Sequence, residues 1–108
     1  MDHPHIPLAQ ALAALSESKQ LFKTFFQHGT LSIELYQPEG EDRQQPHLQD
    51  EVYVVARGEG TFLVSGIRVA FQAGDVLFAP AGAEHRFETF SDDFLVWVIF
   101  YGPEGGEG

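Results

Sequence analysis

A histidine and a glutamate stand four positions apart at the start of an apolar run. His47 and Glu51 lead directly into residues 52–55, which read "VYVV". An imidazole and a carboxylate are both common ligands of divalent metal ions in proteins. The pair therefore has two interpretations, either a strand end exposed to water or two ligands held at the edge of a cavity.

A second stretch, "GDVLFAPAGAEHRFET", places another histidine behind a glycine and proline turn. Five residues separate Gly74 from Pro80, Gly82 stands two positions after the proline, and His85 comes three positions later. In this order and spacing the sequence resembles the cupin family. The second motif of that family reads Gly, five residues, Pro, one residue, Gly, two residues, His, three residues, Asn. The chain departs from it only at the last place, where Thr89 stands for the asparagine.

The first cupin motif reads Gly, five residues, His-x-His, three or four residues, Glu, six residues, Gly. The chain matches it at His47, Glu51 and Gly58. It departs at the first histidine, where Gln45 stands, and Gly40 lies one residue nearer than the motif asks. Cupins are small jelly-roll barrels whose two motifs surround one divalent metal. The resemblance therefore implies an all-β, cupin-like double-stranded β-helix, but not one reaction, because this barrel hosts many activities.

By resemblance, the metal ligands are His47, Glu51 and His85. Gln45 and His47 are two positions apart and would point the same way on a strand, and Glu51 keeps this parity unless the turn between them bulges. Two imidazoles and a carboxylate suit Fe(II), and Mn(II), Ni(II) or Zn(II) could bind there too. The amide of Gln45 could be a fourth ligand or could be solvated. An open coordination position would leave room for chemistry at the metal.

Aromatic residues are expected around such a metal. If His85 faces inward, the period of two sends Phe87 and Thr89 inward with it, and Tyr53 and Val55 follow the same rule on the other strand. This pocket would suit a small, partly apolar organic molecule. Tyr53 is the candidate catalytic residue, since its hydroxyl could bond a substrate or a ligand carboxylate. It could equally be a packed residue with a satisfied hydroxyl.

Other polar residues and motifs of the sequence do not indicate a functional site. Asp50 and Glu84 flank the expected ligands, but one has the opposite parity and the other lies in a turn, so we interpret both as solvated. The sequence has no phosphate-cradling glycine loop followed by a lysine, no serine in a nucleophile elbow and no basic stripe interleaved with aromatic residues.

The rest of the chain predicts the elements that must position these residues. Ala-rich residues 8–17 carry leucines at helical spacing after Pro7, which predicts one short N-terminal helix. Short apolar runs separated by turn residues follow, including two around Ser65-Gly66 that predict a hairpin. About eight evenly spaced strands favour a sandwich or barrel. We expect an N-terminal segment over residues 1–20, the barrel over 21–101 and a flexible tail over 102–108.

Composition limits the partners. The chain has 108 residues, 44% of them hydrophobic, and a formal net charge of −10. A surface this acidic repels nucleic acid and anionic membranes, so we expect neither as a partner. Cysteine is absent, which excludes disulfides and thiolate ligands. The N-terminus shows no secretory signal pattern, so a cytoplasmic location is the default expectation.

Two strands, at residues 52–56 and 94–101, are apolar on both faces. A strand buried on one side only would not need a second apolar face, so that face is expected to meet a partner subunit or the N-terminal helix. On this basis we predict a homodimer.

Together these features predict a metal-dependent enzyme that acts on a small organic molecule. The resemblance implies oxygenase-type chemistry first, because an open metal site can bind a substrate and O2 side by side, and isomerisation or decarboxylation next. The alternative is a non-catalytic module that binds or senses a small ligand on the same barrel.

Overall fold

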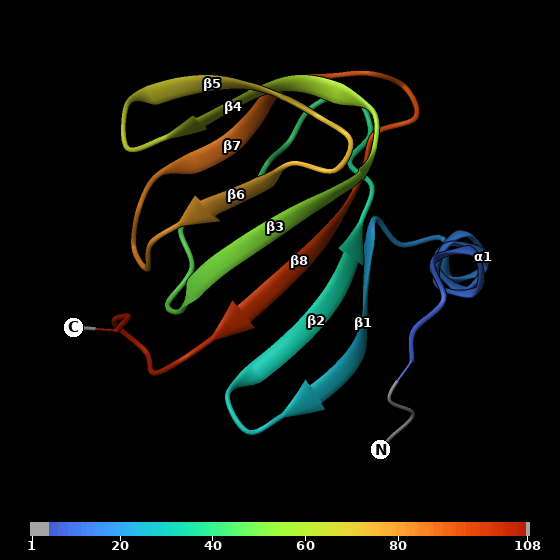
Figure 1. Cartoon of the computed structure of the whole chain (residues 1–108), viewed down its shortest axis with the longest axis horizontal. Coiled ribbons are helices and arrows are strands. Elements are labelled where there is room, and N and C mark those ends of the chain that lie inside the picture. The colour runs from blue at the N-terminus through green and yellow to red at the C-terminus, as the bar shows by residue number, and fades with distance from the viewer. Residues whose placement is uncertain (1–4, 108) are drawn as a thin grey trace.

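The computed structural model describes residues 5–107, which form two antiparallel sheets packed face to face (Figure 1). One helix, α1 (Leu8–Ser18), precedes the strands. This confirms the all-β fold and the short N-terminal helix predicted from the sequence. The strands are β1 (Phe22–His28), β2 (Leu31–Tyr36), β3 (Asp50–Arg57), β4 (Glu59–Val64), β5 (Ile67–Gln72), β6 (Val76–Ala79), β7 (His85–Phe90) and β8 (Leu95–Tyr101).

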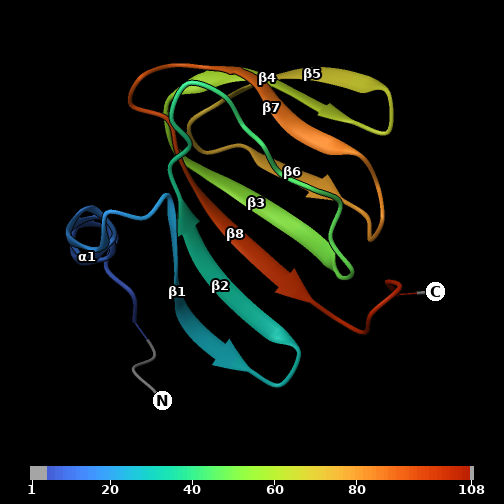
Figure 2. The ribbon, with the colours of Figure 1, turned by 180° about the vertical axis from the view of Figure 1, so that it is seen from behind.

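The larger sheet has the strand order β1-β2-β8-β3-β6 and the smaller one the order β5-β4-β7. Figure 2 shows the same two layers from behind, with the long loop that leaves the top of β2 drawn across β6 on its way to the start of β3. The predicted hairpin at Ser65-Gly66 joins β4 to β5, and both turn residues have positive φ angles of 50° and 81°. Asparagine and glycine are usual at such turns, and the glycine here meets that need.

Aromatic side chains from both sheets fill the space between the layers. Their rings meet edge-on or tilted, with centroids about 5 Å apart, a geometry that aromatic pairs favour. On β3 the alternation of a pleated strand sends Tyr53 and Val55 into this core. The principal core contains Tyr53, Val55, Phe62, Phe71, Ala79, Phe87, Phe94, Val96 and Val98.

The second face of the larger sheet is partly covered by α1. Ala11 and Leu15 of the helix pack against Leu35 of β2 and Leu95 of β8, and all four are buried. Helix α1 thus contacts the apolar outer face of the larger sheet, which is one of the two outcomes expected from the sequence. Helix α1 is too short to cross a membrane, and the described residues contain no helix that could.

Beyond α1 the outer face stays open. Phe78 on the edge strand β6 is 47% exposed and Val76 is 66% exposed. Their neighbours on β3 are Val52 and Val54, which are half-buried. The homodimer stays a prediction, and this open apolar surface is where it would form.

One inward position predicted on β7 is wrong. Thr89 is exposed, and its hydroxyl lies 2.8 Å from that of Thr61 on the outer side of the smaller sheet. The cause is an irregularity in the pairing with β4, where Thr61 lies opposite Thr89 but Phe62 lies opposite Phe87. The extra residue, Glu88, shifts the alternation, so Phe90 packs against the core in place of Thr89.

The C-terminal segment folds back over the start of β3. The backbone N–H of Gly105 donates to the carbonyl of Leu48 at 2.7 Å, and that of Glu107 donates to a carboxylate oxygen of Asp50 at 2.9 Å. The flexibility expected of residues 102–108 stays a prediction. Residues 1–4 of the N-terminal segment and residue 108 of the tail lie outside the described part of the chain.

Candidate metal centre

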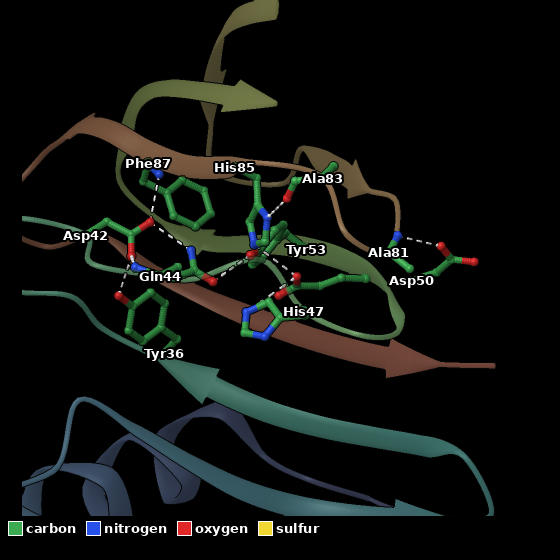
Figure 3. Close-up of polar contacts among 11 residues, drawn as sticks. Tyr36, Asp42, Gln44, His47, Asp50, Tyr53, Ala81, Ala83, His85 and Phe87 are labelled. Atoms are coloured by element: carbon green, nitrogen blue, oxygen red, sulfur yellow. Dashed lines mark hydrogen bonds and ion pairs between the residues drawn. The ribbon is translucent and has the colours of Figure 1, made fainter. Parts of the chain in front are cut away.

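Three side chains expected as ligands converge where the start of β3 in the larger sheet faces the start of β7 in the smaller one. His47 comes from the loop before β3, Glu51 is the second residue of β3, and His85 is the first residue of β7. One ligand atom from each lies within 4.8 Å of the others. In Figure 3 the rings of His47 and His85 point toward each other, with Tyr53 and Gln44 beside them.

The three residues present unpartnered polar atoms to a common point. The Nε2 atom of His85 is 3.1 Å from Oε1 of Glu51, and that of His47 is 3.9 Å from the same oxygen. Only 1% of the side chain of Glu51 and 1% of that of His85 is exposed, against 35% for His47. Both carboxylate oxygens and both Nε2 atoms are buried without a hydrogen-bond partner. Because such atoms are costly to bury unsatisfied, this donor set fits a bound divalent cation.

The backbone fixes which nitrogen of His85 is free. Its Nδ1 atom is 2.9 Å from the carbonyl of Ala83, and since a carbonyl only accepts, Nδ1 carries the proton. In the neutral ring Nε2 then holds a lone pair that faces Glu51, as in metal-bound histidines oriented by a carbonyl. Burial lowers the pKa of His85, but the Glu51 carboxylate and the Ala83 carbonyl together raise it above its usual value.

The turn between β6 and β7 holds His85 in place through Asp50. The N–H of Gly82 donates to the carbonyl of His47 at 2.8 Å, and that of Ala81 donates to Oδ1 of Asp50 at 2.9 Å. The interpretation of Asp50 as solvated is therefore wrong, because the side chain is buried and accepts two backbone hydrogen bonds. These bonds, from Glu107 and Ala81, lower the pKa of Asp50. Glu84, in the same turn, is exposed as predicted.

Gln44, not Gln45, turns toward the interior. Gln45 is exposed, so the structure does not bring it to the three ligands. The side-chain oxygen of Gln44 accepts a 2.8 Å hydrogen bond from the hydroxyl of Tyr53, and its nitrogen donates to Asp42 at 2.7 Å. The equal-parity argument for Gln45 fails because residues 37–49 form a loop and not a strand.

Asp42 was not singled out by sequence reasoning, yet it holds this loop to both sheets. Its buried carboxylate accepts hydrogen bonds from the hydroxyl of Tyr36 at 2.6 Å, the amide of Gln44 and the backbone N–H of Phe87 at 2.8 Å. In a loop as charged as "PEGEDRQQP" nothing marks one aspartate as buried. Burial and the hydrogen bond to Asp42 raise the pKa of Tyr36.

Tyr53 lies in the core behind the ligands. Its side chain is fully buried, and its hydroxyl is engaged by Gln44. Burial first, and the nearby charge of Glu51 second, hold the pKa of Tyr53 well above its usual value. The hydroxyl therefore stays protonated near neutral pH, and its catalytic role stays a prediction.

A model of the cupin domain matches residues 32–101, which is most of the two-sheet structure and includes all three candidate ligands. The chain belongs to the cupin family. An uncharacterised protein of Streptomyces coelicolor is 37% identical to this cupin over 82 residues, which cover 74% of the chain and 78% of the relative.

Acireductone dioxygenases form a second group of relatives. Those of Geobacillus thermodenitrificans and Geobacillus kaustophilus are each 35% identical to this cupin over 66 residues, which cover 55% of the chain. The aligned part spans only 37% of the length of either dioxygenase.

Solved structures agree on the fold. A cupin-2 domain protein from Shewanella frigidimarina has a TM-score of 0.68 at 20% identity, covering 87% of this chain and 91% of its own. KdgF from Halomonas sp. has a TM-score of 0.64 at 20% identity, covering 73% of this chain and 74% of its own.

A cavity of about 760 Å³ adjoins the candidate ligands of this cupin. It reaches from His47 and Glu51 across the inner face of β8 to β2 and the loop that follows. Tyr53 and Phe87, predicted to surround a ligand, pack in the core instead. The walls that sequence reasoning missed are Glu34, Tyr36, Gln44, Val98 and Phe100.

Of the acidic residues that line this cavity, Glu34 is the most distant in sequence from the candidate ligands. It shares the inward parity of Tyr36, while Leu35 between them packs under α1. Its carboxylate accepts a hydrogen bond from the hydroxyl of Thr24 at 3.3 Å. Burial raises the pKa of Glu34 above its usual value. The hydrogen bond from Thr24 opposes this shift, and the charge of Glu51 adds to it.

Proposed function

We propose that this cupin is a metal-dependent enzyme of dioxygenase type that acts on a small organic molecule. The observation that carries the proposal is the convergence of His47, Glu51 and His85, whose buried ligand atoms have no partner in the described structure. The cavity beside them is of a size that holds a small organic ligand. The sequence similarity to acireductone dioxygenases favours oxygenation over other reactions of the barrel.

Two histidines and one carboxylate would hold Fe(II), with Mn(II), Ni(II) and Zn(II) as competitors. A bound ion of this kind supplies open coordination positions, Lewis acidity and, in the case of iron, redox chemistry. Side chains and backbone groups of the protein would orient the ligands and shield the site from water. The Ala83 carbonyl orients His85, Phe100 packs edge-on against the ring of His47, and the apolar wall of β8 limits the access of water.

The test begins with metal content. Protein purified without chelator, and protein reconstituted with each of the four ions, is compared with His85→Ala by elemental analysis. His28→Ala is the matched control, because His28 is exposed at the end of β1 and belongs neither to the three candidate ligands nor to the lining of the cavity beside them. We expect near-stoichiometric metal in the wild type and in the control, and loss of metal in His85→Ala while the circular dichroism spectrum of the fold persists.

Oxygen consumption then separates the two functions. Metal-loaded protein is tested in an oxygen electrode with a panel of small organic molecules, an acireductone among them. Consumption that depends on substrate and disappears in His85→Ala supports the dioxygenase. Tight binding of a panel member without turnover under any metal would support the non-catalytic binding module instead. Equal metal content in the wild type and in His85→Ala would contradict the metal site itself.

A further inference from the structure

The cavity beside the candidate metal centre is acidic on its walls and apolar on its floor. Val98 and Phe100 of β8 form the floor, and the carboxylates of Glu34 and Glu51 stand on either side of it. Glu51 is buried, and its carboxylate faces the imidazoles of His47 and His85, while no Lys or Arg among residues 5–107 pairs with it. A divalent ion bound by the candidate ligands would neutralise negative charge at the Glu51 end of the cavity but not at the Glu34 end.

Among residues 5–107, no Lys or Arg side chain pairs with Glu34. The ion pairs of arginine in this part of the chain join Arg43 to Glu41, Arg68 to Glu88 and Arg86 to Glu84.

Among the described residues that line the cavity, Arg43 is the one Lys or Arg. Its side chain is 83% exposed and lies 3.6 Å from the carboxylate of Glu41, which leaves it at the rim and not at the floor. Away from the candidate metal ligands, an anionic substrate group would therefore meet the Glu34 carboxylate, with no buried Lys or Arg among residues 5–107 to hold it.

We propose that the substrate carries a positively charged nitrogen, as a protonated amine does, on a small apolar body, and that Glu34 selects it. The ammonium group donates to the Glu34 carboxylate, and the body lies on Val98 and Phe100. The inference concerns the same site as the proposed function and rests on it for the metal-binding end of the substrate.

Several properties of the cavity fit such a molecule. A charge-assisted hydrogen bond to a half-buried carboxylate is roughly twice as strong as a neutral one. Aromatic rings attract cations over their faces, and Tyr36 and Phe100 both line the cavity. Burial disfavours the charged form of Glu34 and so holds its pKa above its usual value. A cation bound beside the carboxylate would favour that charged form.

Three probes of matched shape test the preference. Binding of 2-phenylethylamine, 2-phenylethanol and 3-phenylpropanoate is measured by calorimetry at pH 7, with metal-free and with Zn(II)-loaded protein. One charge-assisted hydrogen bond predicts roughly ten- to hundredfold tighter binding of the amine than of the alcohol. In the metal-free protein the carboxylate should bind more weakly than the alcohol, because it meets like charge.

Variants assign the preference to Glu34. Glu34→Gln keeps the size of the side chain and its acceptor for Thr24, and should bind the amine no better than the alcohol. Glu34→Asp keeps the charge and should retain a preference. Glu17→Gln removes one negative charge from the exposed face of α1 and should bind the amine as the wild type does, which excludes a general effect of net charge.

The outcomes separate this inference from the proposed function. Equal binding of the three probes, no binding of the amine, or an unchanged preference in Glu34→Gln would each overturn it. Metal content is measured in the same samples. Protein that takes up metal without preferring the amine overturns this inference alone, and protein that prefers the amine but takes up no metal overturns the proposed function alone.

Discussion

Gln44 and Gln45 are neighbours in the chain but meet different surroundings, and this makes them a matched pair. Gln44→Ala removes the acceptor of the buried Tyr53 hydroxyl and a donor to Asp42. Leaving such a group unsatisfied costs about 1–3 kcal/mol, so we expect a loss of that size in the free energy of unfolding by urea. Gln45→Ala should change neither this free energy nor the metal affinity. Equal effects of the two substitutions would contradict the assignment.

Metal binding should depend on pH through the histidines. A proton on Nε2 of His85 competes with the ion, so affinity falls as the pH falls through the pKa of that ring. Because Glu51 and the Ala83 carbonyl raise this pKa against the effect of burial, the loss should begin above the pH expected of an ordinary histidine. Competition with a chelator between pH 8 and pH 5 measures it. An affinity that does not change over this range would exclude histidine ligation.

From the sequence, the three side chains that converge could be named more easily than their surroundings. His47, Glu51 and His85 could be named because their spacing to glycines and a proline follows a known pattern. Asp42 and Gln44 could not, because burial of one aspartate in a charged loop depends on where the loop crosses the sheets. The same limit explains Gln45, since parity applies only to residues that lie on a strand.

At the scale of elements, Asp50 joins the start of β3 to the turn before β7 and to the C-terminal segment. In Asp50→Asn one of the two accepting oxygens becomes an NH2 group, which cannot accept, and the other loses its negative charge. Amide hydrogen exchange at both Ala81 and Glu107 should therefore become faster. Glu84→Gln, in the same turn but exposed, should leave both rates unchanged. Slow exchange at both amides in Asp50→Asn would show that the carboxylate does not hold this turn.

The lowered pKa of Asp50 gives this contact a pH dependence of defined sign. A carboxyl group whose pKa is lower in the folded than in the unfolded protein stabilises the fold above its unfolded pKa. The stabilisation is lost as the pH falls through the folded value. The wild type should therefore exceed Asp50→Asn in stability at neutral pH, and the difference should shrink in acid, as urea unfolding at several pH values would show.

Strand positions could be predicted from apolar runs, whereas pairing irregularities could not. The runs at residues 52–56 and 94–101 coincide with β3 and β8 to within two residues, and Ser65-Gly66 joins β4 to β5 as predicted. The extra residue at Glu88 was not predicted, although Phe87 and Phe90 in "HRFETF" are three positions apart and could not share one face of a regular strand. Thr89 was consequently assigned to the wrong face of the smaller sheet.

At the scale of the whole molecule, a formal net charge of −10 coexists with an apolar outer face on the larger sheet. We define this outer face by Val52, Val54, Val76, Phe78 and Ile99, which lie in adjacent rows on β3, β6 and β8. Helix α1 covers the neighbouring part of the same face but leaves β6 exposed. Self-repulsion between acidic copies makes association depend on burial of this apolar surface.

We expect two copies to associate through the outer face, with each face packed on its symmetry mate. Because residues at a twofold interface are contributed twice, Phe78→Glu would place two charges in the apolar contact, where burying them is costly. Sedimentation velocity should show a dimer for the wild type and a monomer for this variant. Ile67→Glu is the control, since Ile67 is similarly exposed at 62% but lies on β5 of the other sheet. A wild-type monomer, or a dimer disrupted only by Ile67→Glu, would contradict the assignment of this face.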